Sequence, residues 1–211
     1  MSTLLQIENV TYTYGPANIA VLNDVNAEFE AGSVYSITGP SGAGKSTMLS
    51  LLAGLDAPAK GVVRFDGEDI AKTGYSNHRK EHVSLVFQNF NLIDYLTPLE
   101  NLRLVNSKAD AQVLIDLGLS EEEVNRNVTQ LSGGQQQRVA IGRALVSSAP
   151  VILADEPTGS LDPATTKEVI AILKSAAHDR GKCVIVVTHD SKVASAADVK
   201  YVLKNKQLKK N

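Results

Sequence analysis

Hydrophobic and polar positions follow two different periods in the first third of the chain, one typical of strands and one typical of a helix. The strand pattern covers four runs, at residues 4–14, 25–30, 33–38 and 61–67. Residues 45–55 instead repeat their apolar positions with helical spacing, and the expected buried face carries Met48, Leu49, Leu51, Leu52 and Leu55. We therefore expect a region rich in strands that contains one buried helix.

The middle of the chain, roughly residues 91–145, has mainly helical spacing, and Ser120-Glu-Glu-Glu123 within it has the spacing of a capping box. The last third returns to alternating strands and helices. Residues 150–154 and 182–187 are short continuous apolar runs, typical of strands buried on both faces of a parallel sheet. The pattern predicts an α/β fold with a mainly parallel core sheet, an antiparallel β lobe and an inserted helical lobe.

The composition is that of an ordinary soluble globular protein, with 43% hydrophobic and 21% charged residues among 211. The net charge of −2 argues against binding nucleic acid through bulk positive charge. No apolar stretch approaches the ~20 residues that a membrane-spanning helix needs, and the amino terminus lacks the pattern of a secretory signal. We therefore expect a cytoplasmic protein that reaches a membrane only through a partner.

Three features that could carry a function are interpreted as parts of the core or of the solvated surface instead. Cys183, the single cysteine, lies in an apolar run, which favours a buried side chain over a reactive thiol. His78 and His82 have a spacing that suits zinc, but no third ligand is near and the charged residues between them indicate a solvated face. The lysine-rich tail at 204–210 is expected to be a solvated end, with weak attraction to a membrane surface as the alternative.

A glycine-rich loop follows the strand at 33–38 and opens the helix at 45–55, which is the context of a P-loop. Its glycines allow backbone N–H groups to surround phosphate oxygens, and the helix amino terminus adds partial positive charge. Lys45 would reach the β- and γ-phosphates, and the Ser46 hydroxyl would bind Mg²⁺. An ordinary Gly/Ser loop is the alternative. The residues expected to hold nucleotide are Gly39, Pro40, Ser41, Gly42, Ala43, Gly44, Lys45, Ser46 and Thr47.

Two carboxylates, Asp155 and Glu156, follow the apolar run at 150–154. At the tip of a strand beside a P-loop, Asp155 is placed to bind Mg²⁺. Because neighbouring side chains on a strand point in different directions, Glu156 would instead address a water near the γ-phosphate. These separate roles favour hydrolysis over transfer to a bound acceptor. Without the P-loop, such an acidic pair would be equally compatible with a solvated loop.

The segment Leu131-Ser-Gly-Gly-Gln-Gln-Gln-Arg138 places Ser132, Gly133 and Gly134 before a helix. A helix amino terminus of this kind attracts anions. The segment closely resembles the signature of ABC-type ATPases, and with the P-loop and the acidic pair it extends that resemblance over essentially the whole chain. The resemblance implies the ABC ATPase fold, as a single domain over residues 1–211 with its helical subdomain at approximately 91–145.

Three other positions match the same family. Gln88 corresponds to its Q-loop glutamine, which contacts Mg²⁺ and links nucleotide to the transmembrane partner. Asp162, in the segment 160–162, resembles its D-loop. His189 resembles its switch histidine, which senses the γ-phosphate, although a lone histidine would ordinarily be structural. The resemblance therefore implies three catalytic residues, Glu156, His189 and Gln88, and three Mg²⁺ ligands, Ser46, Gln88 and Asp155.

The resemblance also implies how ATP would be held. Tyr14 lies where the family places an aromatic side chain that stacks on adenine; Tyr12 is the alternative, and the spacing to the P-loop favours Tyr14. Family members form a head-to-tail homodimer with two ATP molecules at the interface. Each ATP would lie between residues 39–47 of one copy and residues 132–134 of the other, a self-complementary arrangement.

Residues 90–101 resemble the segment after the Q-loop in the macrolide-exporter and lipoprotein-release branch, although Asp94 stands where that branch prefers proline. This implies the ATPase subunit of a bacterial exporter of macrolides, antimicrobial peptides or lipoproteins, peripheral on the inner face of the plasma membrane. The transmembrane permease would dock near Gln88–Asn101. Two alternatives stay open. One is a soluble ABC ATPase serving cell-division mechanotransmission, iron–sulfur assembly or nucleic acid; the other is a small-molecule kinase, which leaves residues 132–134 unexplained.

Overall fold

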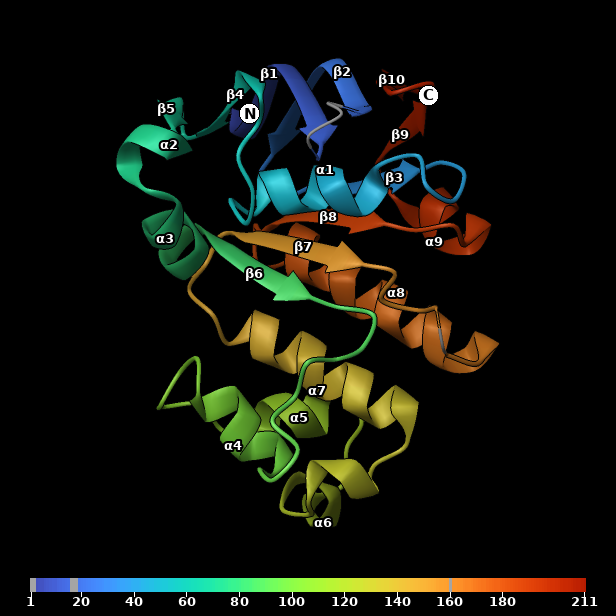
Figure 1. Ribbon diagram of the computed structural model, residues 1–211. Coiled ribbons are helices and arrows are strands. Elements are labelled where there is room, and N and C mark those ends of the chain that lie inside the picture. The colour runs from blue at the N-terminus through green and yellow to red at the C-terminus, as the bar shows by residue number, and fades with distance from the viewer. Residues whose placement is uncertain (1–2, 16–18, 160) are drawn as a thin grey trace.

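The computed structural model describes residues 3–15, 19–159 and 161–211, arranged as two sheets with helices between and around them (Figure 1). One sheet has the order β2-β1-β4-β5, and its neighbouring strands are antiparallel. Its strands are β1 (Thr3–Tyr14), β2 (Ile19–Glu30), β4 (Lys60–Phe65) and β5 (Glu68–Asp69). Between β4 and β5 lies a turn in which Asp66 and Gly67 both have positive φ. The predicted antiparallel lobe is confirmed.

The second sheet has the order β10-β9-β3-β8-β7-β6. Its strands are β3 (Val34–Thr38), β6 (Val83–Val86), β7 (Val151–Asp155), β8 (Cys183–Val187), β9 (Val199–Lys204) and β10 (Gln207–Lys210). Every neighbouring pair is parallel except β9 with β10, which confirms the predicted core sheet. The loops that follow β3, β6, β7 and β8 therefore meet at one edge, where ligands bind in sheets of this kind.

Helix α1 (Lys45–Leu52) lies between the two sheets (Figure 1), and its buried apolar residues belong to the hydrophobic cluster that joins them. It ends earlier than expected, because Gly54 turns the chain at φ 64 and the Leu55 N–H donates to the Ser50 carbonyl oxygen at 2.9 Å. Leu55 is 50% exposed. The prediction that Leu55 shares the buried face of this helix is therefore wrong.

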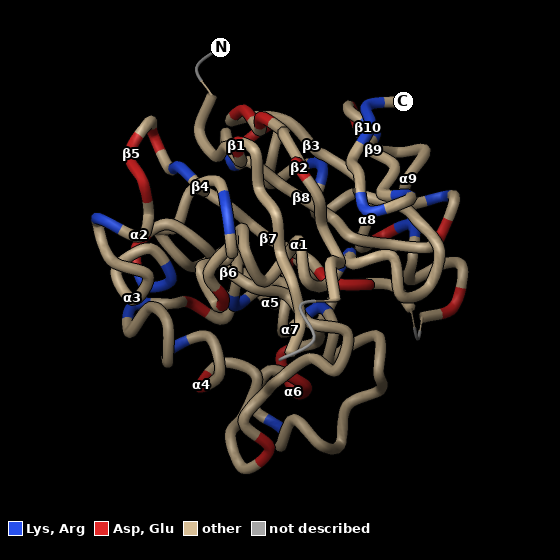
Figure 2. Tube along the Cα trace, turned by 45° about the horizontal axis from the view of Figure 1, so that its top comes forward, with Lys and Arg blue, Asp and Glu red and all other residues tan. Residues whose placement is uncertain are grey.

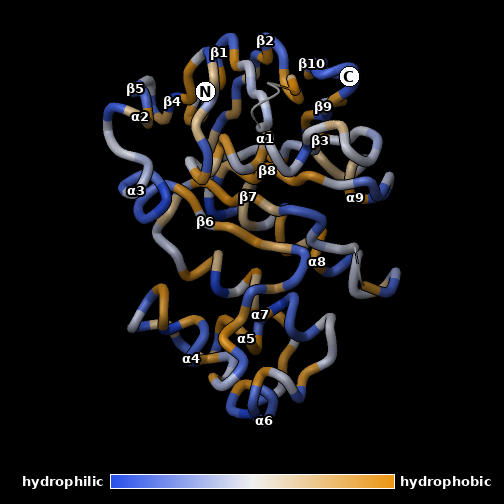
Figure 3. Tube along the Cα trace, in the orientation of Figure 1, coloured by the Kyte–Doolittle hydropathy of each residue, from blue (hydrophilic) through white to orange (hydrophobic). Residues whose placement is uncertain are grey.

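The opposite face of the six-stranded sheet is covered by α8 (Pro163–His178) and α9 (Ser191–Ala196), together with part of α7 (Gly133–Leu145). Hydrophobic positions concentrate on the neighbouring strands β6, β7 and β8 (Figure 3). Cys183 lies on β8 with no exposed surface, and burial raises the pKa of its thiol to about 12. The interpretation of this cysteine as a buried side chain is confirmed.

The predicted helical lobe has a hydrophobic cluster of its own. Before α7 it contains α4 (Pro98–Arg103), α5 (Gln112–Asp116), α6 (Glu121–Val124) and a 3₁₀ turn (Val128–Gln130). The predicted capping box is present at α6, where Ser120 and Glu123 bond to each other's backbone N–H groups. Helix α7 connects the lobe to the core, because Val139 belongs to the lobe's cluster whereas Ile141 belongs to that of the sheet.

Two peripheral segments differ from expectation. The lysine side chains of residues 204–210 are exposed, as expected of a solvated end, but the segment also forms backbone pairs that were not predicted: β10 pairs with β9 through a turn at Asn205 and Lys206, both with positive φ. Before β6 the chain forms α2 (Ile70–Thr73), α3 (Tyr75–Asn77) and a π-helical turn (His78–His82). His78 there is fully buried, with Nε2 3.0 Å from the Leu52 carbonyl oxygen, so it does not share the solvated face of its charged neighbours.

Charges of both signs are interspersed over the elements (Figure 2), in line with the small net charge of −2. Acidic residues gather at the start of α6, and basic residues at the carboxyl-terminal hairpin. Within the described ranges, every helix is too short or too polar to cross a bilayer.

Candidate functional site

A cavity of about 510 Å³ opens at the carboxyl edge of the six-stranded sheet. Its wall combines the loop after β3, the ends of β6 and β7, and the first two strands of the antiparallel sheet. The lining residues are Tyr14, Val21, Ser41, Gly42, Gly44, Lys45, Ser46, Thr47, Gln88, Asp155 and Glu156. All of these except Val21 are residues that the sequence predicts for the site. The fold thus gathers residues that lie far apart along the chain.

The loop between β3 and α1 presents backbone groups and one ammonium group to this cavity. The Lys45 Nζ donates to the carbonyl oxygens of Gly39 (3.0 Å) and Pro40 (3.2 Å), which holds it over the loop. The first turn of α1 contains no acidic residue, so the chain does not neutralise the partial positive charge of the helix terminus. This terminus and Lys45 together suit a phosphate group.

Gly44 precedes α1 at φ 102, in the region that favours glycine. A Cβ at this position would lie 2.6 Å from Val21 Cγ1, so the contact with β2 also excludes a side chain. Val21 is the lining residue that sequence reasoning missed. It belongs to the other sheet, and no local pattern relates it to the P-loop.

Asp155 is the last residue of β7, and its carboxyl group bonds to the Ser46 side chain. Burial raises the pKa of Asp155, and the charge of Glu156 raises it further, while the Ser46 hydrogen bond and Lys45 oppose the shift. Hydroxyl and carboxylate oxygens are the hard donors that Mg²⁺ prefers. The pair therefore suits a bound magnesium ion.

Glu156 and His189, predicted separately, are in direct contact. Residues Asp155 and Val187 are paired in the sheet, so the chain leaves β7 and β8 side by side. The Glu156 Oε1 lies 2.9 Å from His189 Nδ1, and the His189 N–H donates to Glu156 Oε2 at 3.2 Å. The carboxylate is only 14% exposed while the histidine ring is 70% exposed. A nearly buried carboxylate is thus oriented at the cavity wall by a histidine that reaches solvent.

Gln88 lies two residues after β6, and its side chain is at the cavity. A Cβ on Gly159 would lie 3.3 Å from Gln88 Nε2, and the Gly159 N–H donates to the Glu156 carbonyl oxygen at 3.1 Å. The amide of Gln88 therefore packs against the loop that carries Glu156.

Of the two tyrosines that the sequence left open, Tyr14 lines the cavity. It is 50% exposed, and its hydroxyl lies 3.1 Å from Thr47 Oγ1 in the phosphate loop. Tyr12 is buried, packs edge-to-face on Tyr14 and bonds to the Asp56 carboxylate. The exposed ring of Tyr14 is therefore the one available to a ligand.

Residues 132–134 lie apart from this cavity. Ser132 caps α7: its hydroxyl oxygen accepts from the Gln135 N–H at 3.3 Å, and the Gln135 Oε1 accepts from the Ser132 N–H at 2.8 Å. Gly133 and Gly134 form the first turn of α7 rather than preceding it, which corrects the predicted boundary. Ser132 and Gly133 are exposed, and the described cavity-lining residues include none of the three.

Asp162 also lies away from the cavity lining that the structure describes. It caps α8, accepting from the Thr165 hydroxyl at 2.6 Å and from the Ala164 N–H at 2.9 Å. The hydrogen bond from Thr165 is the main cause of its lowered pKa. Ser160, in the same predicted segment, falls outside the described residues.

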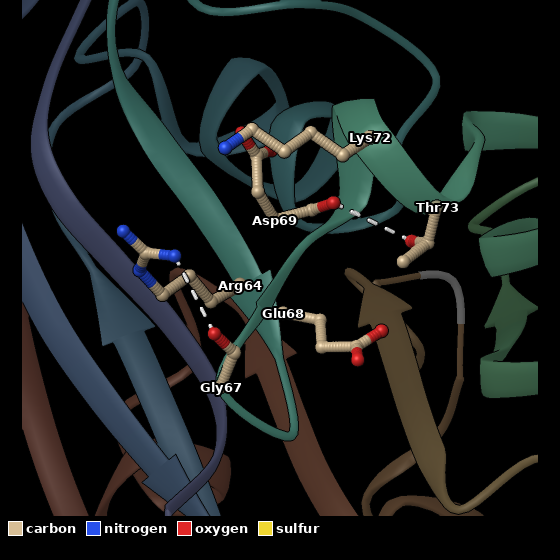
Figure 4. Close-up of a pocket in the computed structure, with 6 residues that line it drawn as sticks. All are labelled: Arg64, Gly67, Glu68, Asp69, Lys72 and Thr73. Atoms are coloured by element: carbon tan, nitrogen blue, oxygen red, sulfur yellow. Dashed lines mark hydrogen bonds between the residues drawn. The ribbon is translucent and has the colours of Figure 1, made fainter.

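A second hollow, of about 400 Å³, lies at the edge of the antiparallel sheet, formed by β4, β5 and α2 (Figure 4). The Arg64 guanidinium bonds to the Gly67 carbonyl oxygen there, and the Thr73 hydroxyl bonds to the Asp69 carbonyl oxygen, both at 3.4 Å. Although Glu68 and Asp69 line this hollow, none of the site residues predicted from the sequence does. The cavity beside the phosphate loop is therefore the candidate site.

Known proteins resemble this chain in sequence and in fold. The family described as "ABC transporter" matches residues 22–159. The chain is 42% identical over 207 residues to the uncharacterized ABC transporter ATP-binding protein YclH of Bacillus subtilis, covering 93% of this chain and 92% of that protein. It is 41% identical over 213 residues to the macrolide export ATP-binding/permease protein MacB of Salmonella typhi, where it covers 94% of this chain and 33% of MacB.

The solved structures that resemble the fold include two of MJ0796, an ABC transporter cassette of Methanocaldococcus jannaschii. One is a dimeric structure, with a TM-score of 0.87 and 39% sequence identity, covering 98% of both chains. The other is a dimeric post-hydrolysis state bound to ADP and Pi, with a TM-score of 0.87 and 38% identity, covering 99% of this chain and 98% of that one.

Proposed function

The chain belongs to the ABC transporter family of ATP-binding ATPases, and we propose that it powers a bacterial export complex by closing and reopening a dimer with ATP. The cargo class we propose is that of the MacB-like exporters: macrolides, antimicrobial peptides or lipoproteins. The similarity to MacB supports this class, although the chain spans only about a third of MacB. The complex includes a membrane permease, and the chain works at the inner face of the membrane.

We assign the 510 Å³ cavity to ATP and Mg²⁺. The phosphate chain lies on the loop and the amino end of α1, with Lys45 moved from its own loop carbonyls to the β- and γ-phosphates. The exposed ring of Tyr14 stacks on adenine. Ser46, Asp155 and Gln88 hold Mg²⁺, which when bound would neutralise phosphate charge. The Ser46–Asp155 contact supports this set, because both donors already converge.

The Glu156–His189 contact is the observation that carries hydrolysis. Glu156 acts as the general base: its carboxylate, 14% exposed, orients a water and takes a proton from it as the water attacks the γ-phosphorus. The bond between that phosphorus and the β–γ bridging oxygen breaks, and ADP and phosphate leave. His189 holds this carboxylate through both its ring and its backbone N–H, and its exposed ring is free to meet a γ-phosphate. Gln88 packs beside the same loop and reports the state of the site to the partner.

We propose a dimer because Ser132 and Gly133 lie apart from the cavity of their own chain. Ser132 and Gly133 are exposed at the amino terminus of α7, where N–H groups and the helix dipole attract anions. We propose that they meet the γ-phosphate bound by a second copy, with Asp162 at the same interface. The exposure of these residues and the dimeric state of MJ0796 support this arrangement.

The permease docks beside residues 88–101. A groove of about 410 Å³ lies next to this segment, and its wall includes the exposed apolar residues Leu104 and Val105. Tyr95, within the segment itself, is 82% exposed. Exposed apolar side chains on the wall of the groove and in the segment before it favour a protein partner.

Replacement of the proposed base tests the mechanism. Glu156→Gln should bind ATP with Mg²⁺ but lower kcat by at least about 100-fold, because an amide does not accept the proton of the attacking water. The variant should therefore accumulate as an ATP-bound dimer in size-exclusion chromatography, and the tagged, trapped form should retain a membrane subunit during purification. Glu121→Gln, on the exposed start of α6, is the control. If the Glu156→Gln protein stays monomeric in ATP, or hydrolyses ATP at the normal rate, the assignment of Glu156 as the general base is wrong.

A further inference from the structure

A strained corner follows Gln88 directly. Phe90 and Asn91 both adopt left-handed backbone conformations, with φ 57 and 48. Asparagine tolerates this region, but a bulky aromatic residue rarely occupies it. The corner turns the chain from the cavity toward the segment proposed to meet the permease. Something in the surrounding structure must hold it.

Arg143 binds both carbonyl oxygens of this corner. Its NH1 donates to the Asn91 oxygen at 2.6 Å, and its NH2 donates to the Phe90 oxygen at 3.1 Å. The planar guanidinium is suited to two acceptors at once. Burial lowers the pKa of Arg143, because its charge is partly withdrawn from water. The two carbonyl oxygens are the polar groups that the guanidinium bonds to there.

The same helix touches the corner a second time. Gly133, in the first turn of α7, lies against the Phe90 ring: a Cβ there would be 3.8 Å from Phe90 Cζ. Arg143 lies ten residues later in the helix, roughly 15 Å further along its axis. Helix α7 therefore contacts the corner at two places: Gly133, next to Ser132, contacts the Phe90 ring, and Arg143 binds the carbonyl oxygens.

We propose that Arg143 is a positioning residue for ATP hydrolysis, which locks the Phe90–Asn91 corner and thereby aims Gln88 into the cavity in register with Ser132. The inference rests on the proposed function, because it assigns a means of holding Gln88 at the Mg²⁺ site proposed there. Arg143 touches no cavity-lining residue in the described contacts; it acts through the backbone of the corner. Arg143 also lines the groove beside this segment, so a partner docked there would contact the side chain that holds the corner.

Arg143→Lys tests the lock. Lysine keeps the charge but lacks the fork that bridges two carbonyl oxygens. We expect kcat to fall about tenfold with the KM for ATP changed by less than about threefold, because Tyr14 and the phosphate loop are untouched. The Mg²⁺ concentration for half-maximal turnover should rise. In a Gln88→Ala background, Arg143→Lys should lower kcat by less than about twofold further, because both changes act on one group.

A local measurement accompanies the kinetics. Amide hydrogen exchange across residues 88–93 should accelerate by about tenfold or more in Arg143→Lys, and remain unchanged in the control Arg103→Lys. Arg103 also donates to a backbone carbonyl oxygen, that of Ala109 at 3.3 Å, but on α4 and away from the corner. If Arg143→Lys does not fold, Phe90→Leu, which removes the ring contact and keeps Arg143, should show the same Gln88-dependent loss, by about threefold.

Two outcomes would overturn the inference: unchanged exchange across 88–93 in Arg143→Lys, or a kcat loss that persists in full in the Gln88→Ala background. Failure of the proposed function has a different signature. The wild-type chain would not hydrolyse ATP, or Gln88→Ala would be as active as wild type. The exchange measurement still decides in that case whether Arg143 holds the corner.

Discussion

At the scale of single residues, the site is built under strain. Glu156 has φ 47, a left-handed conformation that costs a non-glycine residue about 1–2 kcal/mol. Its N–H donates to the Val187 carbonyl oxygen at 2.9 Å, and His189 holds its carboxylate. These bonds over-determine the conformation. They hold the carboxylate of Glu156 against His189, whereas the carboxyl group of Asp155 bonds to Ser46, so the two adjacent acids have different partners at the cavity.

Ionised Asp155 also destabilises the folded state, so we predict that its replacement raises the thermal stability in a pH-dependent way. Burial raises the pKa of its carboxyl group above the unfolded value of about 3.9, so the folded state disfavours the charged form. Its ionisation therefore lowers the free energy of unfolding at pH 7, and this cost disappears as the pH falls below the unfolded pKa. Without nucleotide and metal, Asp155→Asn should raise Tm at pH 7, by an amount that shrinks toward pH 4.

Thermal unfolding of both proteins in a chelator, between pH 4 and 8, measures this difference. A Tm for Asp155→Asn that is equal to or below wild type at pH 7 would contradict the prediction. The same substitution should abolish Mg²⁺-dependent turnover, because it removes the carboxylate proposed for the metal.

At the scale of elements, helix α7 connects the signature residues, the helical lobe, the core and the corner after Gln88. Its amino-terminal cap is Ser132 and its first turn carries Gly133. Its middle packs in both the lobe and the core, and Arg143 near its end holds the corner after Gln88. The helix has no acidic residue in its first turn, so its terminus remains attractive to anions. A movement of the lobe would therefore move the signature and the corner together.

The cap of α7 allows a matched pair of substitutions. Ser132→Ala and Ser120→Ala each remove a capping hydroxyl of the same geometry, from α7 and α6 respectively. Each should cost about 1 kcal/mol of stability. Only Ser132→Ala should reduce ATPase activity, on the order of 10²-fold, because only that hydroxyl is proposed to donate to a phosphate in the transition state.

Chemical denaturation and steady-state turnover on the two variants make the comparison. Equal losses of activity in both, or full activity in Ser132→Ala, would remove the signature hydroxyl from the mechanism.

At the scale of the whole molecule, the two halves of the predicted site do not meet within one chain. The cavity holds Lys45, while Ser132 faces solvent on another part of the surface. A two-fold dimer solves this, because each copy supplies the half that the other lacks. Activity should then depend on pairs of chains rather than on single chains.

Mixing two inactive variants tests this directly. Lys45→Ala removes the ammonium group of the phosphate loop, and Ser132→Ala removes the hydroxyl group of the signature. Each homodimer of one variant therefore contains two defective sites. In a mixed dimer both defects fall in one site and the other is intact. An equimolar mixture should form mixed dimers in about half of cases, and recover roughly a quarter of the wild-type rate per chain if the sites act independently. Mixed dimers that form but stay inactive would contradict sites that are shared and independent.

Where the sequence pattern failed, a contact or a turn elsewhere in the fold decided the outcome. Val21 lines the cavity because β2 crosses over Gly44. Leu55 left the buried face because Gly54 ends α1. Residues 207–210 form a strand because β9 offers an edge for backbone pairing. Each outcome depends on a neighbour that is distant in sequence or on a single turn, and hydrophobic periodicity records neither.

The chain's own pattern determined the chemistry available to this protein: a phosphate loop, an acidic strand end and a second anion-seeking helix terminus, in a recognisable order. Those elements are local, because their glycines, caps and apolar runs act over a few residues. Only the tertiary structure decided which groups meet. Parallel pairing of β7 with β8 placed Glu156 against His189, and α7 placed Arg143 on the corner after Gln88 while leaving Ser132 exposed. These contacts depend on strand order and helix packing, which no short stretch of sequence specifies.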